Sequence, residues 1–209
     1  MGVDQTPDEV KTAIAETLLA LGMRQCPVLI AGRVGVGKST VAAIVARSFS
    51  TWAWFGLDEL LTTLMACRTE GSVQRYDAQG YAVHTTEQQL LRRVEQVGCL
   101  VLDDVGTRTI SEPQAEALRA VLDARIGVAR PLICTTNCNT QGLDETVGAR
   151  NRSRLLGGAV VQIRGPDRRS VRALSEGHSG GISGGENGWY GPTKSEQKTS
   201  KKSGGSPPP

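Results

Sequence analysis

The run Gly32-Arg-Val-Gly-Val-Gly-Lys38-Ser39 constrains the fold more than any other feature of the sequence. It matches the pattern G-x-x-x-x-G-K-[ST], follows the short apolar run 27–31 and precedes a segment with helical spacing over 39–47. Glycines in such a loop let backbone N–H groups surround phosphate oxygens, at a point where a helix N-terminus also attracts anions. The run therefore predicts a buried strand, a phosphate-binding loop and a helix, in that order.

This loop predicts the cofactors ATP and Mg²⁺. Lys38 would reach the β- and γ-phosphates, and the Ser39 hydroxyl would ligate Mg²⁺. The residues expected to bind the nucleotide are Gly32, Val34, Gly35, Val36, Gly37, Lys38, Ser39 and Thr40.

A second apolar run ends in two acids, as Leu100-Val-Leu-Asp103-Asp104. Beside a phosphate-binding loop it fits a Walker B strand, in which Asp103 would hold Mg²⁺ together with Ser39. Asp104 would orient or activate the attacking water. Thr135-Thr136-Asn137 ends a further apolar run, and its Asn137 could position water against the γ-phosphate.

Apolar runs alternate with helical patterns along the chain, which predicts an α/β fold with a mainly parallel, five-stranded sheet. A helix is expected to open at Thr6-Pro7-Asp8-Glu9, and residues 68–84 show no period and are expected to form a surface loop. We expect an N-terminal helix over 1–24, an ATPase domain over 25–174 and a disordered tail over 175–209. The predicted strands are 27–31, 51–55, 99–102, 131–136 and 159–163, and the later helices 39–47, 57–67, 85–97 and 111–126.

The tail and the charges limit the function classes further. Residues 175–209 contain nine Gly, seven Ser and four Pro, too little apolar surface to offset the entropy of ordering. Residues 150–172 hold seven arginines against one acid, Asp167, and phosphate is the leading partner for such a cluster. No membrane span or signal peptide is apparent, and five scattered cysteines favour reduced thiols in a cytoplasmic protein.

The order of motifs from Gly32 to Arg169 resembles the DnaC-like and IstB-like branch of the AAA+ ATPases, which comprises helicase loaders and transposition helpers of bacteria and phages. The resemblance rests on the two nucleotide motifs, on Thr-Thr-Asn137 and on the segments 148–155 and 165–169. It implies an AAA+ three-layer P-loop fold. By the same resemblance Asn137 is the sensor 1 residue, Arg154 an arginine finger serving a neighbouring subunit, and Arg169 a sensor 2 arginine that binds nucleotide. Arg150 aligns with a further, supportive arginine.

The sequence departs from that family in three places. About one helix precedes the first strand, where loaders usually carry a separate helicase-gripping module. Asp104 stands where many AAA+ enzymes have Glu, and its shorter arm predicts slow turnover. After Arg169 the tail begins almost at once, so we expect little or no helical lid.

The resemblance implies an ATP hydrolase that loads a replicative helicase, binds single-stranded DNA and works as an ATP-dependent homo-oligomer. The near alternative is a transposition helper that binds duplex DNA and a transposase. A P-loop kinase and a non-hydrolysing DNA-binding adaptor also remain open. Trp52 and Trp54 share one strand face, where packing under a helix is favoured over stacking on DNA bases.

Overall fold

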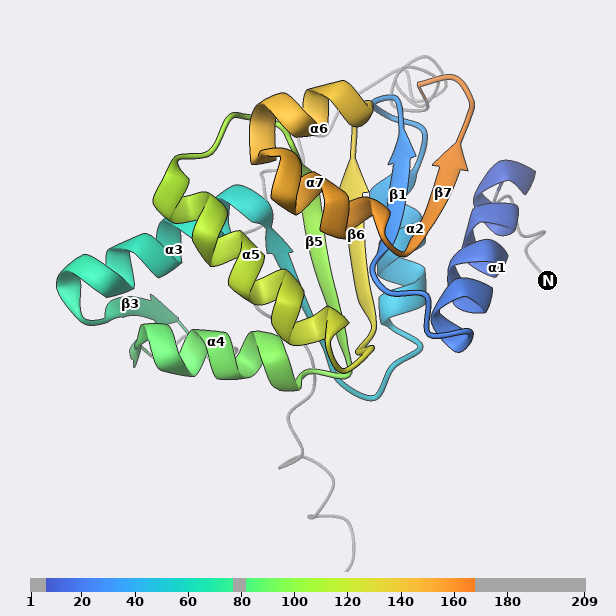
Figure 1. The fold of residues 1–209 in the computed structure, drawn as a ribbon. Coiled ribbons are helices and arrows are strands. Elements are labelled where there is room, and N and C mark those ends of the chain that lie inside the picture. The colour runs from blue at the N-terminus through green and yellow to red at the C-terminus, as the bar shows by residue number, and fades with distance from the viewer. Residues whose placement is uncertain (1–6, 77–81, 168–209) are drawn as a thin grey trace, which may run out of the picture.

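Five parallel strands form the central sheet, in the order β2-β5-β6-β1-β7 (Figure 1). The structure is a computed structural model that describes residues 7–76 and 82–167. Arg169 and the expected tail lie outside these residues. The strands are β1 (Val28–Gly32), β2 (Trp52–Gly56), β5 (Cys99–Val105), β6 (Leu132–Thr136) and β7 (Ala159–Ile163). The predicted five-stranded parallel sheet is therefore confirmed.

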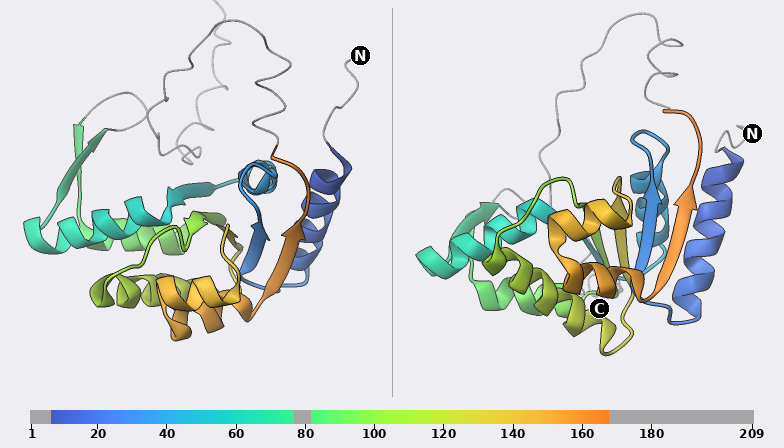
Figure 2. Two further views of the ribbon diagram at one scale, coloured as in Figure 1. Left: turned by 90° about the horizontal axis from the view of Figure 1, so that it is seen from above. Right: turned by 45° about the horizontal axis from the view of Figure 1, so that its top comes forward.

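Alternate residues of the strands enter two separate cores, because successive side chains of a strand point to opposite faces. Leu100 and Leu102 of β5 join one core, while Cys99 and Val101 join the other. The second core lies under α1 (Asp8–Gly22) and α2 (Lys38–Ala46), and the first under the remaining helices, which gives three layers (Figure 2). Those helices are α3 (Leu57–Glu70), α4 (Glu87–Gln96), α5 (Glu112–Ile126), α6 (Thr140–Val147) and α7 (Ala149–Leu156).

One prediction about local structure is wrong, and one segment received no prediction. The expected surface loop contains an antiparallel hairpin, β3 (Val73–Tyr76) and β4 (Ala82–Thr85), which lies at the opposite end of the molecule from α1 (Figures 1 and 2). The segment after β6, for which no element was predicted, forms α6 and α7. The hairpin strands are short and polar, so they carry little of the apolar periodicity on which sequence-based assignment depends. The helices α6 and α7 have eight residues each and bury only two side chains each, which gives a weak signal.

Capping signals mark helix starts closely. Ser111 and Gln114 form a capping box at the start of α5, where the helix over 111–126 was expected to begin. The box that begins α4 is made by Thr86 and Gln89, one residue later than expected. At the start of α1, Pro7 occupies the N-cap position, and Thr6 lies outside the described residues.

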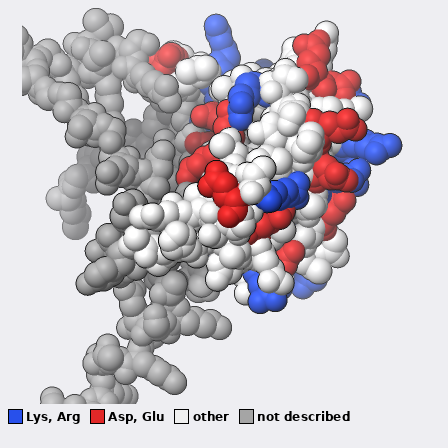
Figure 3. Space-filling model, turned by 90° about the vertical axis from the view of Figure 1, so that its left-hand side faces the viewer, with Lys and Arg blue, Asp and Glu red and all other residues white. Residues whose placement is uncertain are grey.

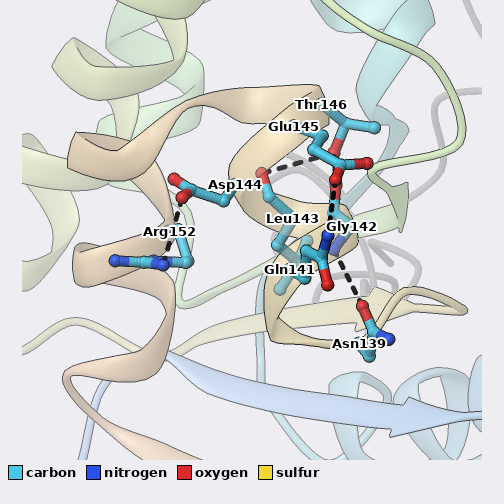
Figure 4. Close-up of polar contacts among 8 residues, drawn as sticks. All are labelled: Asn139, Gln141, Gly142, Leu143, Asp144, Glu145, Thr146 and Arg152. Atoms are coloured by element: carbon cyan, nitrogen blue, oxygen red, sulfur yellow. Dashed lines mark hydrogen bonds and ion pairs between the residues drawn. The ribbon is translucent and has the colours of Figure 1, made fainter.

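An ion pair connects α6 and α7, the two helices that were not predicted from the sequence. Arg152 Nη1 of α7 lies 3.3 Å from Asp144 Oδ2 of α6 (Figure 4). The turn before α6 is closed by the side chain of Asn139, which accepts a hydrogen bond of 2.8 Å from the Gly142 N–H (Figure 4). The pair thus joins α7 to α6 at the surface of the domain.

The five cysteines are free thiols, as expected. Burial raises the pKa of Cys99 to about 12, so this thiol is unreactive. Among the described residues, no helix has both the length and the apolar character needed to span a bilayer.

Candidate nucleotide-binding site

The loop between β1 and α2 has the backbone that phosphate binding requires. Gly35 and Gly37 have φ angles of +77° and +107°, a region that glycine enters without steric cost. Val36 is fully buried and anchors the loop in the core, while Val34 is exposed. Gly32 packs so closely that a Cβ there would lie 2.5 Å from the carbonyl oxygen of Ile163. The loop is thus held against the core through Val36 and Gly32.

Lys38 is the first residue of α2, and its side chain is buried among oxygen acceptors. Its Nζ donates to the backbone oxygen of Arg33 at 2.9 Å and to Asn137 Oδ1 at 2.5 Å. Asn137 directly follows β6, the strand next to β1. The structure therefore brings together the expected phosphate-binding lysine and the expected sensor 1 residue.

Asp103 lies at the carboxyl end of β5, within reach of two hydroxyl groups. Ser39 Oγ lies 3.1 and 3.3 Å from its two carboxylate oxygens, and Thr135 Oγ1 donates to Oδ1 at 2.5 Å. Desolvation is the main cause that raises the pKa of the Asp103 carboxyl group, and the nearby charge of Asp104 adds to it. A cation beside Asp103 would offset both effects.

The donor set around Asp103 fits Mg²⁺. This ion prefers hard oxygen ligands and takes one or two carboxylates, with phosphate oxygens and water filling the remaining positions. Ser39 and Asp103 supply a hydroxyl and a carboxylate in contact with each other. No group of three or more His, Cys, Asp or Glu side chains within residues 7–76 and 82–167 could hold a metal alone. The arrangement therefore fits a magnesium ion that arrives with phosphate.

The strand bends sharply at Asp104, which has a φ of +57°, uncommon for a residue with a side chain. Its N–H donates to Thr135 Oγ1 at 3.0 Å, and the register between β5 and β6 shifts at this point. Gly106 follows with a φ of +88°. The bend leaves the Asp104 carboxylate exposed, while Asp103 remains half-buried.

Beside the two acids lies a cavity of about 650 Å³ between α2, β2 and the start of α3. Its wall includes Trp52, Trp54, Asp58, Asp103 and Asp104. Both indoles are half-buried and pack against the core beneath α1 and α2. Core packing therefore accounts for one side of each ring, and the cavity leaves the other side open.

The arginines of α7 are not part of this assembly. Arg154 pairs with Asp123 of α5 through Nε to Oδ1 and through Nη2 to Oδ2 at 3.1 Å. This contact lowers the pKa of Asp123 and raises that of Arg154. Arg150 is exposed, and Arg152 is paired with Asp144. The basic cluster is thus partly neutralised within its own chain.

Three residues of the site were not predicted. Thr135 links the two acids through its hydroxyl group. Val10 of α1 would lie 3.1 Å from a Cβ on Gly37, so the first helix supports the loop. Asp167 lies against Gly35. The Thr-Thr-Asn run contained a signal for Thr135, because a hydroxyl at a strand end next to a Walker B strand can bond its carboxylate.

The comparisons with known sequences point to one kind of relative. No protein-family model matches the chain. The chain is 25% identical over 136 residues to the replicative helicase loader DnaC of Escherichia coli K12 and, equally, of Shigella flexneri. The match covers 65% of this chain and 52% of each relative. The chain therefore matches only about half the length of these curated relatives.

Solved structures share the fold. A DnaC helicase loader aligns with a TM-score of 0.61 and 18% identity, over 78% of this chain and 94% of that one. DnaA from Aquifex aeolicus, bound to AMPPCP, aligns with a TM-score of 0.62 and 18% identity, over 82% of this chain and 51% of DnaA. The resemblance drawn from the motifs is thereby confirmed: the chain has a P-loop NTPase fold of the AAA+ type and is similar to the DnaC-like AAA+ proteins.

Proposed function

We propose that the chain is an ATPase that loads a replicative helicase and binds single-stranded DNA, with ATP hydrolysed between subunits. One observation carries the proposal. Lys38, Ser39, Asp103 and Asn137 meet at the carboxyl ends of neighbouring strands, while Arg154 lies on another helix and contacts Asp123. The residues proposed to bind phosphate and Mg²⁺ lie together in one chain, whereas the expected arginine finger lies away from them. This arrangement fits an active site shared by two copies of the chain.

Each residue has a proposed task. The loop amides and Lys38 would bind the phosphates, and Ser39 and Asp103 would hold Mg²⁺, which neutralises phosphate charge. Asp104 would orient the attacking water and accept its proton, and Asn137 would fix that water against the γ-phosphate. Lys38 contacts Asn137, so phosphate binding at Lys38 would directly affect Asn137, the residue proposed to position the water. Arg154 of a neighbouring copy would stabilise the charge of the transition state.

The choice of a helicase as partner rests on the sequence relatives, which are replicative helicase loaders. A bacterial cytoplasm, including that of a phage host, is the proposed place of action. For DNA, α7 carries three arginines, of which Arg150 is exposed and two lie in surface ion pairs. On the end of the molecule drawn in Figure 3, acidic and basic side chains are interspersed. We therefore propose that DNA phosphates approach the α7 side, where a salt-dependent affinity is expected.

The test is ATP turnover by the protein alone, with single-stranded DNA, with duplex DNA and with a replicative helicase. Stimulation by single strands and by helicase, lost in Lys38→Ala, is the expected result. Stimulation mainly by duplex DNA would instead favour the transposition helper. Phosphate transfer to a small acceptor, without DNA dependence, would contradict both.

A further inference from the structure

A carboxylate of the chain covers the phosphate-binding loop. Asp167 lies four residues beyond the end of β7, and its side chain reaches Gly35 in the middle of the loop. A Cβ built on Gly35 would lie 1.8 Å from Asp167 Oδ1 and 2.3 Å from its Cγ. The carboxyl group is therefore in direct contact with the Gly35 backbone, in space that only a glycine leaves open.

The surroundings of Gly35 attract anions of any kind. The loop precedes the N-terminus of α2, where unpaired N–H groups and the helix dipole produce a positive potential. A phosphate group and a carboxylate use the same donors and carry charge of the same sign. Asp167 thus has the chemistry of a phosphate competitor that the chain itself supplies.

Phosphates and the Asp167 carboxylate cannot both lie against this loop without cost. Two like charges about 4 Å apart repel by about 1 kcal/mol in water and several times more where water is excluded. A triphosphate carries several such charges, whereas a nucleoside carries none. The repulsion therefore depends on the phosphates and not on the base or the sugar.

We propose that Asp167 is an autoinhibitory plug, defined as a carboxylate that occupies the phosphate-binding loop and that ATP must displace. This inference rests on the proposed binding of ATP at the same loop. Asp167 is exposed, so it can leave without unfolding the core.

Calorimetric titration of the full chain with ATP, ADP and adenosine, in the presence of Mg²⁺, tests the plug. Asp167→Asn removes the charge at nearly constant size, and Asp167→Ala removes the whole carboxyl group. Glu16→Gln, on the exposed side of α1, is the matched control with the same change in net charge. Lys38→Ala reports on the loop itself, and thermal melting checks that each variant is folded.

Both Asp167 variants are expected to lower the Kd for ATP by about tenfold, which corresponds to roughly 1.4 kcal/mol. The gain should be smaller for ADP and absent for adenosine, and Glu16→Gln should match the unchanged protein. An unchanged Kd, a weaker affinity for ATP or an equal gain for adenosine would overturn the plug while leaving ATP binding intact. ATP binding by none of the proteins would overturn both the plug and the proposed function.

Discussion

The phosphate-binding loop and helix α7 differ in how their charged residues are held. At the loop, buried Lys38 and half-buried Asp103 are bonded to side chains from other strand ends. On α7, Arg154 is held by a single carboxylate, Asp123, on the surface of the same chain. The first arrangement is enclosed by protein, and the second consists of contacts that water and salt compete with.

Under the proposed function, this difference matches a division of work between the loop and α7. A group that must bind the same phosphates in every cycle benefits from a fixed position, because no ordering is required at the moment of reaction. A group that serves another subunit must be able to leave its resting contact. The pairing of Arg154 with Asp123 is therefore compatible with a role in trans, provided that the contact exchanges readily.

Lys38→Ala gives the largest expected effect. Loss of the ammonium group removes the only loop side chain that reaches both Asn137 and the expected phosphates. We expect ATP affinity to fall at least about 100-fold and turnover to become undetectable. Titration with ATP and a phosphate-release assay measure these two quantities. Retention of near-normal ATP affinity would mean that the loop does not bind phosphate through Lys38.

Arg154→Ala tests most sharply whether the phosphate-binding loop and α7 have different roles. Turnover should fall by about a thousandfold, while the Kd for ATP changes less than about twofold, because the arginine acts only in the transition state. Mixing Arg154→Ala with Lys38→Ala should restore part of the turnover, since each variant supplies what the other lacks.

Arg152→Ala is the matched control, on the same helix and also in a surface ion pair. Its turnover should remain within about threefold of the unchanged protein. Equal losses in both arginine variants, with no recovery on mixing, would show that α7 matters for stability and not for catalysis.

The residues that meet at the phosphate-binding loop could be predicted well from the sequence. They lie in contiguous motifs, and the parallel sheet places their strand ends together, so Lys38, Ser39, Asp103 and Asn137 could be named together. The strand positions follow from continuous apolar runs such as 99–102. These are local signals, and local signals are what a single sequence contains.

The arrangement of the arginines on α7 could be predicted only in part. Neither α6 nor α7 was expected, and the pairing of Arg154 with Asp123 joins residues that are 31 positions apart. Asp167 was counted only as the single acid in a basic cluster, although it reaches back to Gly35. Contacts of this kind depend on tertiary geometry, which no periodicity or spacing reveals.

Arg125→Ala tests whether burial distinguishes a structural arginine from the exposed arginines of α7. Arg125 is fully buried in α5, and its guanidinium donates to the carbonyl oxygens of Val94, Glu95, Val97 and Pro131. Burial lowers its pKa to about 10. The substitution leaves these acceptors without their donor, so we expect the free energy of unfolding to fall by about 3 kcal/mol. Urea denaturation measures it, and a loss below that of Arg152→Ala would contradict this interpretation.

Asp123→Ala is expected to have the smallest effect. It is also the most sensitive test of the difference between the phosphate-binding loop and α7. It removes the resting partner of Arg154 and leaves the arginine in place. Since the pair is solvent-exposed, stability should change little, but turnover should rise by about two- to threefold as Arg154 becomes available to a neighbour. Phosphate release over a range of protein concentrations measures the gain, which should be largest where subunits are fully associated. A fall in turnover would mean instead that Asp123 holds Arg154 in its working position, and that the contact within the chain is part of the active arrangement.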